Sequence, residues 1–135
     1  MSKDWVKDIH EMQTKYGVHD WIAKADKDRL RSYLDFRIDF LREELDETEA
    51  ALVSMDAEEI VDGLIDLCVV AIGTLDAFGV NPYKAWDEVL QANMAKEVGK
   101  KPSRPNPLGV PDLVKPDNWK GPSHKGNHGK LNDIQ

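Results

Sequence analysis

The chain has 135 residues and a formal net charge of −7, which is spread unevenly. Residues 99–135 hold seven Lys and Arg against three Asp, a balance of +4, so residues 1–98 carry −11. An acidic body argues against binding to a nucleic acid polymer. The longest apolar run, Leu67 to Gly73, is far too short to span a membrane.

Helical periodicity first appears near the N-terminus. Trp5, Ile9, Met12 and Tyr16 recur at spacings of four, three and four, which predicts a short amphipathic helix that ends at Gly17. We expect residues 18–25 to form a loop.

A long second helix should follow, with Asp26 or Asp28 as its cap. Its predicted core stripe comprises Leu30, Leu34, Ile38, Leu41, Leu45 and Leu52. A neighbouring stripe comprises Phe40, Glu44, Glu47 and Ala51. These two glutamates should therefore border the core.

A third helix is predicted from about residue 57 to residue 78, followed by Gly79. Between Ile60 and Leu75 its only charged residues are Asp62 and Asp66, so it is apolar on most sides. A helix that is apolar on most sides is normally buried by neighbouring elements on every side, and one small helical hairpin cannot bury it completely. We therefore expect a homo-oligomer, with a dimer as the minimum and a tetramer favoured.

Asn81 and Pro82 provide the cap and the first residue of a fourth helix that fades near Gly99. Six of the seven prolines and five of the nine glycines follow in residues 99–135, which indicates an extended tail. The predicted organisation is an all-α domain over residues 1–98 and a basic C-terminal tail over residues 99–135. The tail should pack partly on the body and be loosely held from residue 121 onward.

Two acidic clusters are the strongest functional signal, one at residues 43–47 and one at residues 58–66. Glu44 and Glu47 are three residues apart, as are Glu59 and Asp62, and such pairs share one face of a helix. In an antiparallel hairpin the two pairs would lie at similar heights. Converging carboxylates repel each other unless a hard cation such as Mg²⁺, Mn²⁺ or Ca²⁺ lies between them. Solvated helix faces are the alternative, above all for Glu43, Asp46 and Glu58.

Other polar residues give less direct signals. Asn93 and Lys96 end the fourth helix, and Lys100, Lys101 and Arg104 follow, so these side chains either contact phosphate or form a solvated basic linker. Cys68, the single cysteine, fits a reducing compartment and should lie in the core. His10 and His19 carry no pattern that indicates a site.

The two acidic clusters together resemble the signature of the MazG-like all-α nucleoside triphosphate pyrophosphohydrolases. In this chain Glu43-Glu44-x-x-Glu47 is followed, after eleven residues, by Glu59-x-x-Asp62. The segment from Asn93 to Lys96 also resembles that family. The segment from Val114 to Trp119 resembles its short, single-domain members encoded by phages. The resemblance covers roughly residues 30–120. It implies a four-helix bundle that hydrolyses a nucleoside triphosphate to a monophosphate and pyrophosphate with Mg²⁺, for which Mn²⁺ can substitute.

Roles follow from the resemblance by position. It implies that Glu44, Glu47, Glu59 and Asp62 are the metal ligands, with Asp66 in support. Glu43 would orient or deprotonate the attacking water, or only support the ligands. Asn93 and Lys96 would contact sugar and phosphate, and we add Lys101 and Arg104 as contacts for the outer phosphates.

The expected substrates are deoxynucleoside triphosphates, with dGTP and dCTP as the first candidates. The alternatives are a phosphoribosyl-ATP pyrophosphohydrolase and a non-catalytic helical assembly module. Because the N-terminal residues lack the apolar run of a signal peptide, we expect a cytoplasmic protein, in the host cytoplasm if a phage encodes it.

Overall fold

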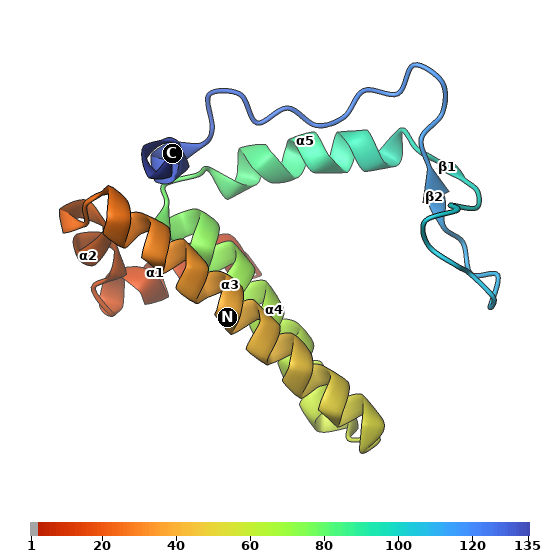
Figure 1. The fold of residues 1–135 in the computed structure, drawn as a ribbon, viewed down its shortest axis with the longest axis horizontal. Helices are drawn as coiled ribbons and strands as arrows, with labels where there is room; N and C mark the ends of the chain where they lie inside the picture. Colours follow the sequence, from red (N-terminus) through yellow and green to blue (C-terminus); the bar gives the residue numbers. More distant parts are fainter. Residues whose placement is uncertain (1–2) are drawn as a thin grey trace. The chain divides into compact units, whose positions relative to one another are not determined.

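The computed structural model describes residues 3–135, and helices are its main secondary structure (Figure 1). The described α-helices are α1 (Trp5–Lys15), α2 (Val18–Lys24), α3 (Lys27–Val53), α4 (Ala57–Ala77) and α5 (Pro82–Met94). Two short antiparallel strands, β1 (Glu97–Val98) and β2 (Leu113–Val114), and a 3₁₀ helix, η1 (Gly129–Ile134), follow. The predicted all-α fold is confirmed.

The described residues form two compact units. The first contains the chain up to Pro82 together with His128–Gln135, and the second contains Tyr83–Asn127. The predicted division into residues 1–98 and 99–135 stays a prediction, and its first two residues lie outside the described part of the chain. No single described helix has the length and apolar composition to cross a membrane, and α4 and α5 meet that test only when taken together.

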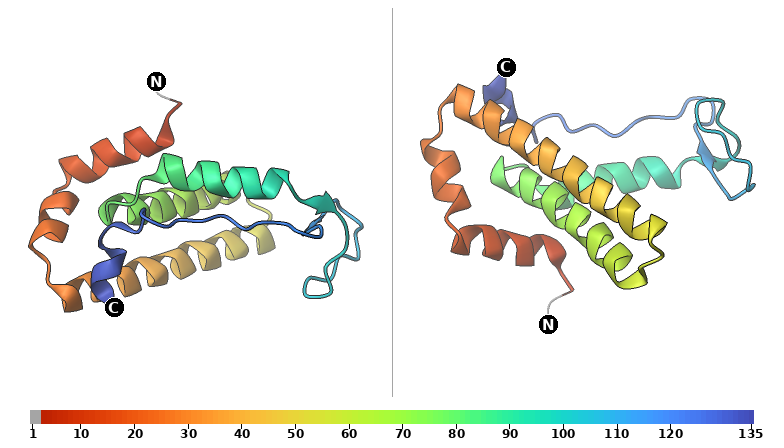
Figure 2. Two further views of the ribbon diagram at one scale, coloured as in Figure 1. Left: turned by 90° about the horizontal axis from the view of Figure 1, so that it is seen from above. Right: turned by 60° about the horizontal axis from the view of Figure 1, so that its bottom comes forward.

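Helices α3 and α4 lie side by side in opposite directions and form the body of the first unit (Figure 2). Each begins at an aspartate cap. The Asp26 carboxylate accepts a hydrogen bond from the Arg29 N–H at 2.9 Å, and the Asp56 carboxylate accepts one from the Glu59 N–H at 3.2 Å. The helices approach closely at Gly63, where an added Cβ would stand 2.2 Å from Thr48 Oγ1. This contact sets the register of the hairpin beside the acidic clusters.

The predicted core stripe of α3 is only partly correct. Leu30 is buried, but Ile38, Leu45 and Leu52 are exposed. The neighbouring stripe turns partly toward α4 instead: Ala51 is buried, and Phe40 and Glu44 are half-buried. Glu47 on the same stripe is exposed, so only one of the two glutamates borders the core. The small residue at position 63 accounts for this rotation, because it lets α4 approach the side of α3 that carries Thr48.

The loop predicted for residues 18–25 is wrong, because Val18–Lys24 form α2. Gly17 lies between α1 and α2 with a φ of 77°, a left-handed conformation that turns the chain directly from one helix into the next. Ile22 anchors α2 with a buried side chain. One buried position in seven residues is too little for helical periodicity to reveal.

The end of the chain is held more firmly than the sequence predicts. The Lys130 N–H donates to the Phe78 carbonyl at 2.7 Å, and Lys130 Nζ donates to the Ile22 carbonyl at 3.3 Å. A Cβ at Gly129 would stand 2.1 Å from the same Phe78 carbonyl, so only glycine allows this approach.

The prediction of a core position for Cys68 is wrong, since its side chain is exposed.

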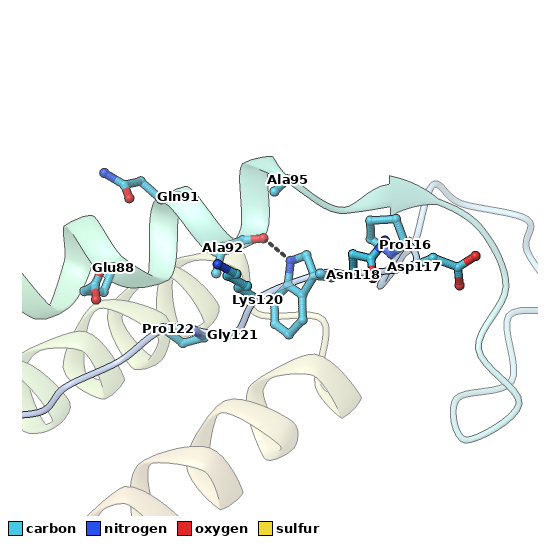
Figure 3. Close-up of a pocket in the computed structure, with 11 residues that line it drawn as sticks. Glu88, Gln91, Ala92, Ala95, Pro116, Asp117, Asn118, Lys120, Gly121 and Pro122 are labelled. Carbon is cyan, nitrogen blue, oxygen red and sulfur yellow. Dashed lines mark hydrogen bonds between the residues drawn. The ribbon is translucent and has the colours of Figure 1, made fainter.

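In the second unit the tail returns along α5. Trp119 Nε1 donates to the Ala92 carbonyl at 2.7 Å, and the Ser123 N–H donates to Glu88 Oε1 at 3.3 Å. Figure 3 shows the pocket beside the Trp119 indole. Its walls come from α5, from Ala95 just after it, and from residues 116–122.

Candidate functional site

Four carboxylates from α3 and α4 lie near that of Glu44. Its pKa is raised, first because burial disfavours its charged form and then because of nearby negative charges. Those charges belong to Glu47, Asp66, Glu43 and Asp62, in decreasing order of effect. Two helices therefore direct acidic side chains toward one region, as the hairpin arrangement requires.

The register of the hairpin explains which carboxylates meet. Thr48 and Gly63 are opposite each other, so Glu44, four residues earlier on α3, is nearly level with Asp66 on α4. Glu47 and Asp62 lie close to the level of Gly63. Asp66 is therefore a more direct neighbour of Glu44 than the sequence pattern alone suggests.

Glu59 is placed differently from the other predicted ligands. It lies four residues before Gly63, which corresponds to a shift of about 6 Å toward the turn between the helices. Among the described residues, it is not one of the charges that raise the pKa of Glu44. Its role as a ligand remains a prediction.

Solvent reaches most of this cluster. Glu44 and Asp66 are half-buried, whereas Glu43, Glu47 and Asp62 are exposed. Asp62 is therefore open to solvent in the single chain, although its neighbours along α4 are mostly apolar. A small ion and a polar ligand can both approach these side chains from solvent.

The chemistry of this donor set fits a hard divalent cation. All five groups offer only carboxylate oxygens, and every charge that shifts the pKa of Glu44 is negative. The sequence has no Lys or Arg between Arg42 and Lys84. A bound cation would relieve this mutual repulsion.

The predicted phosphate and sugar contacts all belong to the second unit. Asn93 is exposed near the end of α5, and Lys96 Nζ lies 5.3 Å from the centre of the Trp119 ring. Arg104 donates two hydrogen bonds to the Asp112 carboxylate, the one from Nε at 3.0 Å. These bonds hold the pKa of Asp112 below its usual value, and Lys101 adds a smaller effect. None of the four lies among the described residues that line the pocket of Figure 3.

No pattern in the sequence indicated a second polar cluster in the first unit. His10 on α1 and His19 on α2 both contact the carboxylate of Asp76 on α4, at 2.6 and 2.7 Å. The partners are 66 and 57 residues apart in the chain, and His19 lies in the predicted loop. Only the packing of three helices brings them together.

Comparison with known proteins agrees with the acidic signature. The phosphoribosyl-ATP pyrophosphohydrolase family matches residues 23–93, which is more than half of the chain. The matched segment contains α3, α4 and both acidic clusters and ends at Asn93. Comparison with curated proteins gave no match. The resemblance to the MazG-like all-α pyrophosphohydrolases is confirmed at this level, and the chain belongs to the phosphoribosyl-ATP pyrophosphohydrolase family of that superfamily.

Proposed function

We propose that the protein is a Mg²⁺-dependent hydrolase that splits the α–β phosphoanhydride of a nucleoside triphosphate into a monophosphate and pyrophosphate. Membership of a pyrophosphohydrolase family supports the type of bond. The observation that carries the proposal is the gathering of acidic side chains around Glu44 from both helices of the hairpin.

Glu44, Glu47 and Asp62 would hold Mg²⁺, or Mn²⁺ in its place, with Glu59 as the fourth proposed ligand. Asp66 supports them, because its charge acts directly on Glu44. When bound, the ion supplies positive charge beside the phosphate oxygens at which negative charge develops during cleavage.

The remaining proposed roles belong to the protein side chains. Glu43 accepts a proton from the attacking water and orients that water toward the α-phosphorus. Asn93 contacts the sugar and Lys96 a phosphate, while Lys101 and Arg104 contact the outer phosphates. Arg104 would exchange Asp112 for a phosphate, since its guanidinium can pair in the same bidentate way with either oxyanion.

For the substrate we propose a deoxynucleoside triphosphate, with dGTP and dCTP to be tested first. The resemblance of residues 114–119 to the short, phage-encoded members supports this choice. Phosphoribosyl-ATP is the second candidate, and the family match favours it. Both substrates present the same bond and release the same pyrophosphate.

We also propose a homo-oligomer, a tetramer by preference and a dimer at least. In the single chain the exposed fractions of Val61, Leu64 and Ile65 on α4 are 64%, 52% and 41%. Val53 and Met55 beside the hairpin turn are more than three-quarters exposed. Val61, Leu64 and Ile65 share one face of α4, and an exposed apolar face of this kind is typical of a protein interface. Light scattering coupled to size-exclusion chromatography measures the assembly directly.

The proposed activity is tested by chromatography of the products. The purified protein is incubated with a panel of NTPs, dNTPs and phosphoribosyl-ATP, with and without Mg²⁺. Monophosphate and pyrophosphate should form only with the metal, and the ranking of rates names the substrate. Turnover of phosphoribosyl-ATP alone would replace our first substrate. A folded protein that cleaves none of these compounds would contradict the proposed function and favour the assembly module.

A further inference from the structure

We propose that His10, His19 and Asp76 form a binding site for a divalent transition-metal ion of the Zn²⁺ type. The site would tie α1 and α2 to the C-terminal end of α4. It is distinct from the acidic cluster around Glu44, and it does not depend on the proposed hydrolase function.

The three side chains already converge on one point. His10 Nδ1 lies 2.6 Å from Asp76 Oδ1, and His19 Nε2 lies 2.7 Å from Asp76 Oδ2. One ligand atom from each residue can be chosen so that all three lie within 4.8 Å of one another. Zinc–nitrogen and zinc–oxygen bonds are about 2.0–2.2 Å long, so the two imidazoles would have to move outward from the carboxylate to admit one ion among the three.

Thr14 determines how the His19 ring meets the carboxylate. The Thr14 hydroxyl donates its only hydrogen to the His10 carbonyl at 2.9 Å. It must therefore accept the hydrogen bond from His19 Nδ1, which lies 3.1 Å away. A neutral His19 then has its proton on Nδ1 and a lone pair on Nε2.

This tautomer directs a nitrogen lone pair at the Asp76 carboxylate. Two lone pairs 2.7 Å apart repel each other unless a cation lies between them, either a second proton on the ring or a metal ion. A hydrogen bond to the far nitrogen is also the usual way in which proteins orient a metal-binding imidazole. The contact between Thr14 and His19 therefore prepares Nε2 to be a ligand.

The position of Asp76 adds a second reason for a cation. Its side chain is only 9% exposed, and it lies in the last turn of α4, where the helix dipole disfavours negative charge. That turn contains no basic residue. Two imidazoles and one carboxylate are softer donors than a set of carboxylates, so they favour Zn²⁺ and related ions over Mg²⁺. The His10 side chain is 58% exposed, so water can reach the site and complete the coordination.

The test is calorimetric titration of the full chain with ZnCl₂ at neutral pH in excess Mg²⁺, which keeps the carboxylate cluster occupied. We expect saturable binding of one ion per chain and a higher melting temperature with Zn²⁺. His10→Gln and His19→Gln should each weaken binding at least about tenfold and abolish the thermal shift. His128→Gln, an exposed histidine on the edge of η1, is the matched control and should change neither measurement.

His10→Gln is the decisive variant, because its exposed ring can be replaced without opening the core, and circular dichroism verifies its fold. Unchanged Zn²⁺ binding in both His10→Gln and His19→Gln would overturn the proposal. Loss of that binding in Glu47→Gln would also overturn it, since the ion would then occupy the acidic cluster. Absence of saturable binding in the unmodified protein would also overturn the proposal.

Discussion

Helix α4 carries two polar clusters that are built on opposite principles. In the first half of α4, Asp62 and Asp66 lie near carboxylates of α3, and the negative charges of both helices repel one another around Glu44. In its last turn, Asp76 meets two imidazoles at 2.6 and 2.7 Å. The first cluster is open to solvent and lacks compensating charge, whereas the second is compact and places two imidazole nitrogens against one carboxylate.

This difference shows what each cluster can do. A compact set of complementary donors holds its geometry and joins helices together. A set of repelling carboxylates favours the arrival of a cation and of anionic groups that the cation can bind. We therefore propose that the acidic cluster performs the hydrolysis and that the histidine cluster joins α1 and α2 to α4.

Removal of a carboxylate from the acidic cluster should have the largest effect on turnover. Asp62→Asn keeps the shape of the side chain but removes a proposed ligand charge, so kcat/KM should fall by about 10²–10³-fold. Steady-state kinetics with the best substrate of the panel measures this. Asp46→Asn, an exposed position on α3 next to Glu47, is the control and should retain turnover. Equal loss in both variants would contradict a localised site.

Glu59→Gln tests the ligand that lies nearest the hairpin turn. We expect turnover to be lost while the circular dichroism spectrum stays unchanged, because the substitution reduces negative charge in the hairpin. Glu59 would lose its place among the ligands if this variant kept the turnover of the unmodified protein. Unfolding of Glu59→Gln would count against a purely functional role.

The glycines beside the two clusters should differ in their tolerance of a methyl group. In Gly63→Ala the new Cβ would meet Thr48 Oγ1 at 2.2 Å and Thr48 Cβ at 3.2 Å, so we expect a loss of about 1–3 kcal/mol from overpacking. In Gly73→Ala the nearest atom is Arg37 Nη2 at 2.9 Å, the end of a flexible side chain, and the loss should be smaller. Urea unfolding of both variants compares them.

A double variant refines this comparison. Adding Thr48→Ala to Gly63→Ala should restore part of the lost stability, because it removes the nearer of the two clashing atoms. If the two substitutions were simply additive, the close contact between α3 and α4 would not be the cause of the loss.

The raised pKa of Glu44 predicts an unusual dependence of stability on pH. The folded protein holds this proton more tightly than the unfolded chain, so stability should fall as the pH rises from the ordinary value of 4.5 through the raised pKa. Without metal, Glu44→Gln should therefore melt a few degrees higher than the unmodified protein at neutral pH, with the difference shrinking in acid. Mg²⁺ should reverse the order, and a melting series with and without Mg²⁺ checks both signs.

The smallest effect should come from the ion pair of the second unit. Arg104→Ala should raise KM a few-fold with little change in melting temperature, because the Arg104 side chain is largely open to solvent, where ion pairs add little stability. Asp112→Asn should lower KM, because it releases the guanidinium for phosphate. If neither variant changed KM, Arg104 would serve only to hold residues 104–112 together.

Local patterns in the sequence predicted much of the fold and the acidic hairpin. The predicted cap Asp26 starts α3, and the three-residue spacing of Glu44 and Glu47 can be read directly from the sequence. The side of α3 that faces α4 could not be predicted from the sequence, because it depends on the contact between Thr48 and Gly63 on two different helices.

The histidine cluster shows the same limit more sharply. His10, His19 and Asp76 belong to three helices, and no local spacing relates them. The register of the hairpin also brought Asp66 nearer to Glu44 than the linear motif implies. Periodicity in the sequence predicted the helices, but it could not predict the contacts that form when different helices pack together.

The exposed position of Cys68 provides a reporter within the proposed interface. It is the only thiol in the chain and lies two residues after Asp66, on the same helix as the exposed Leu64 and Ile65. Its rate of reaction with a thiol reagent should therefore fall as protein concentration rises, if association covers this part of α4. The same sulfur offers a single labelling point within two helical turns of the acidic cluster, so one fluorophore could follow both assembly and metal binding without any substitution.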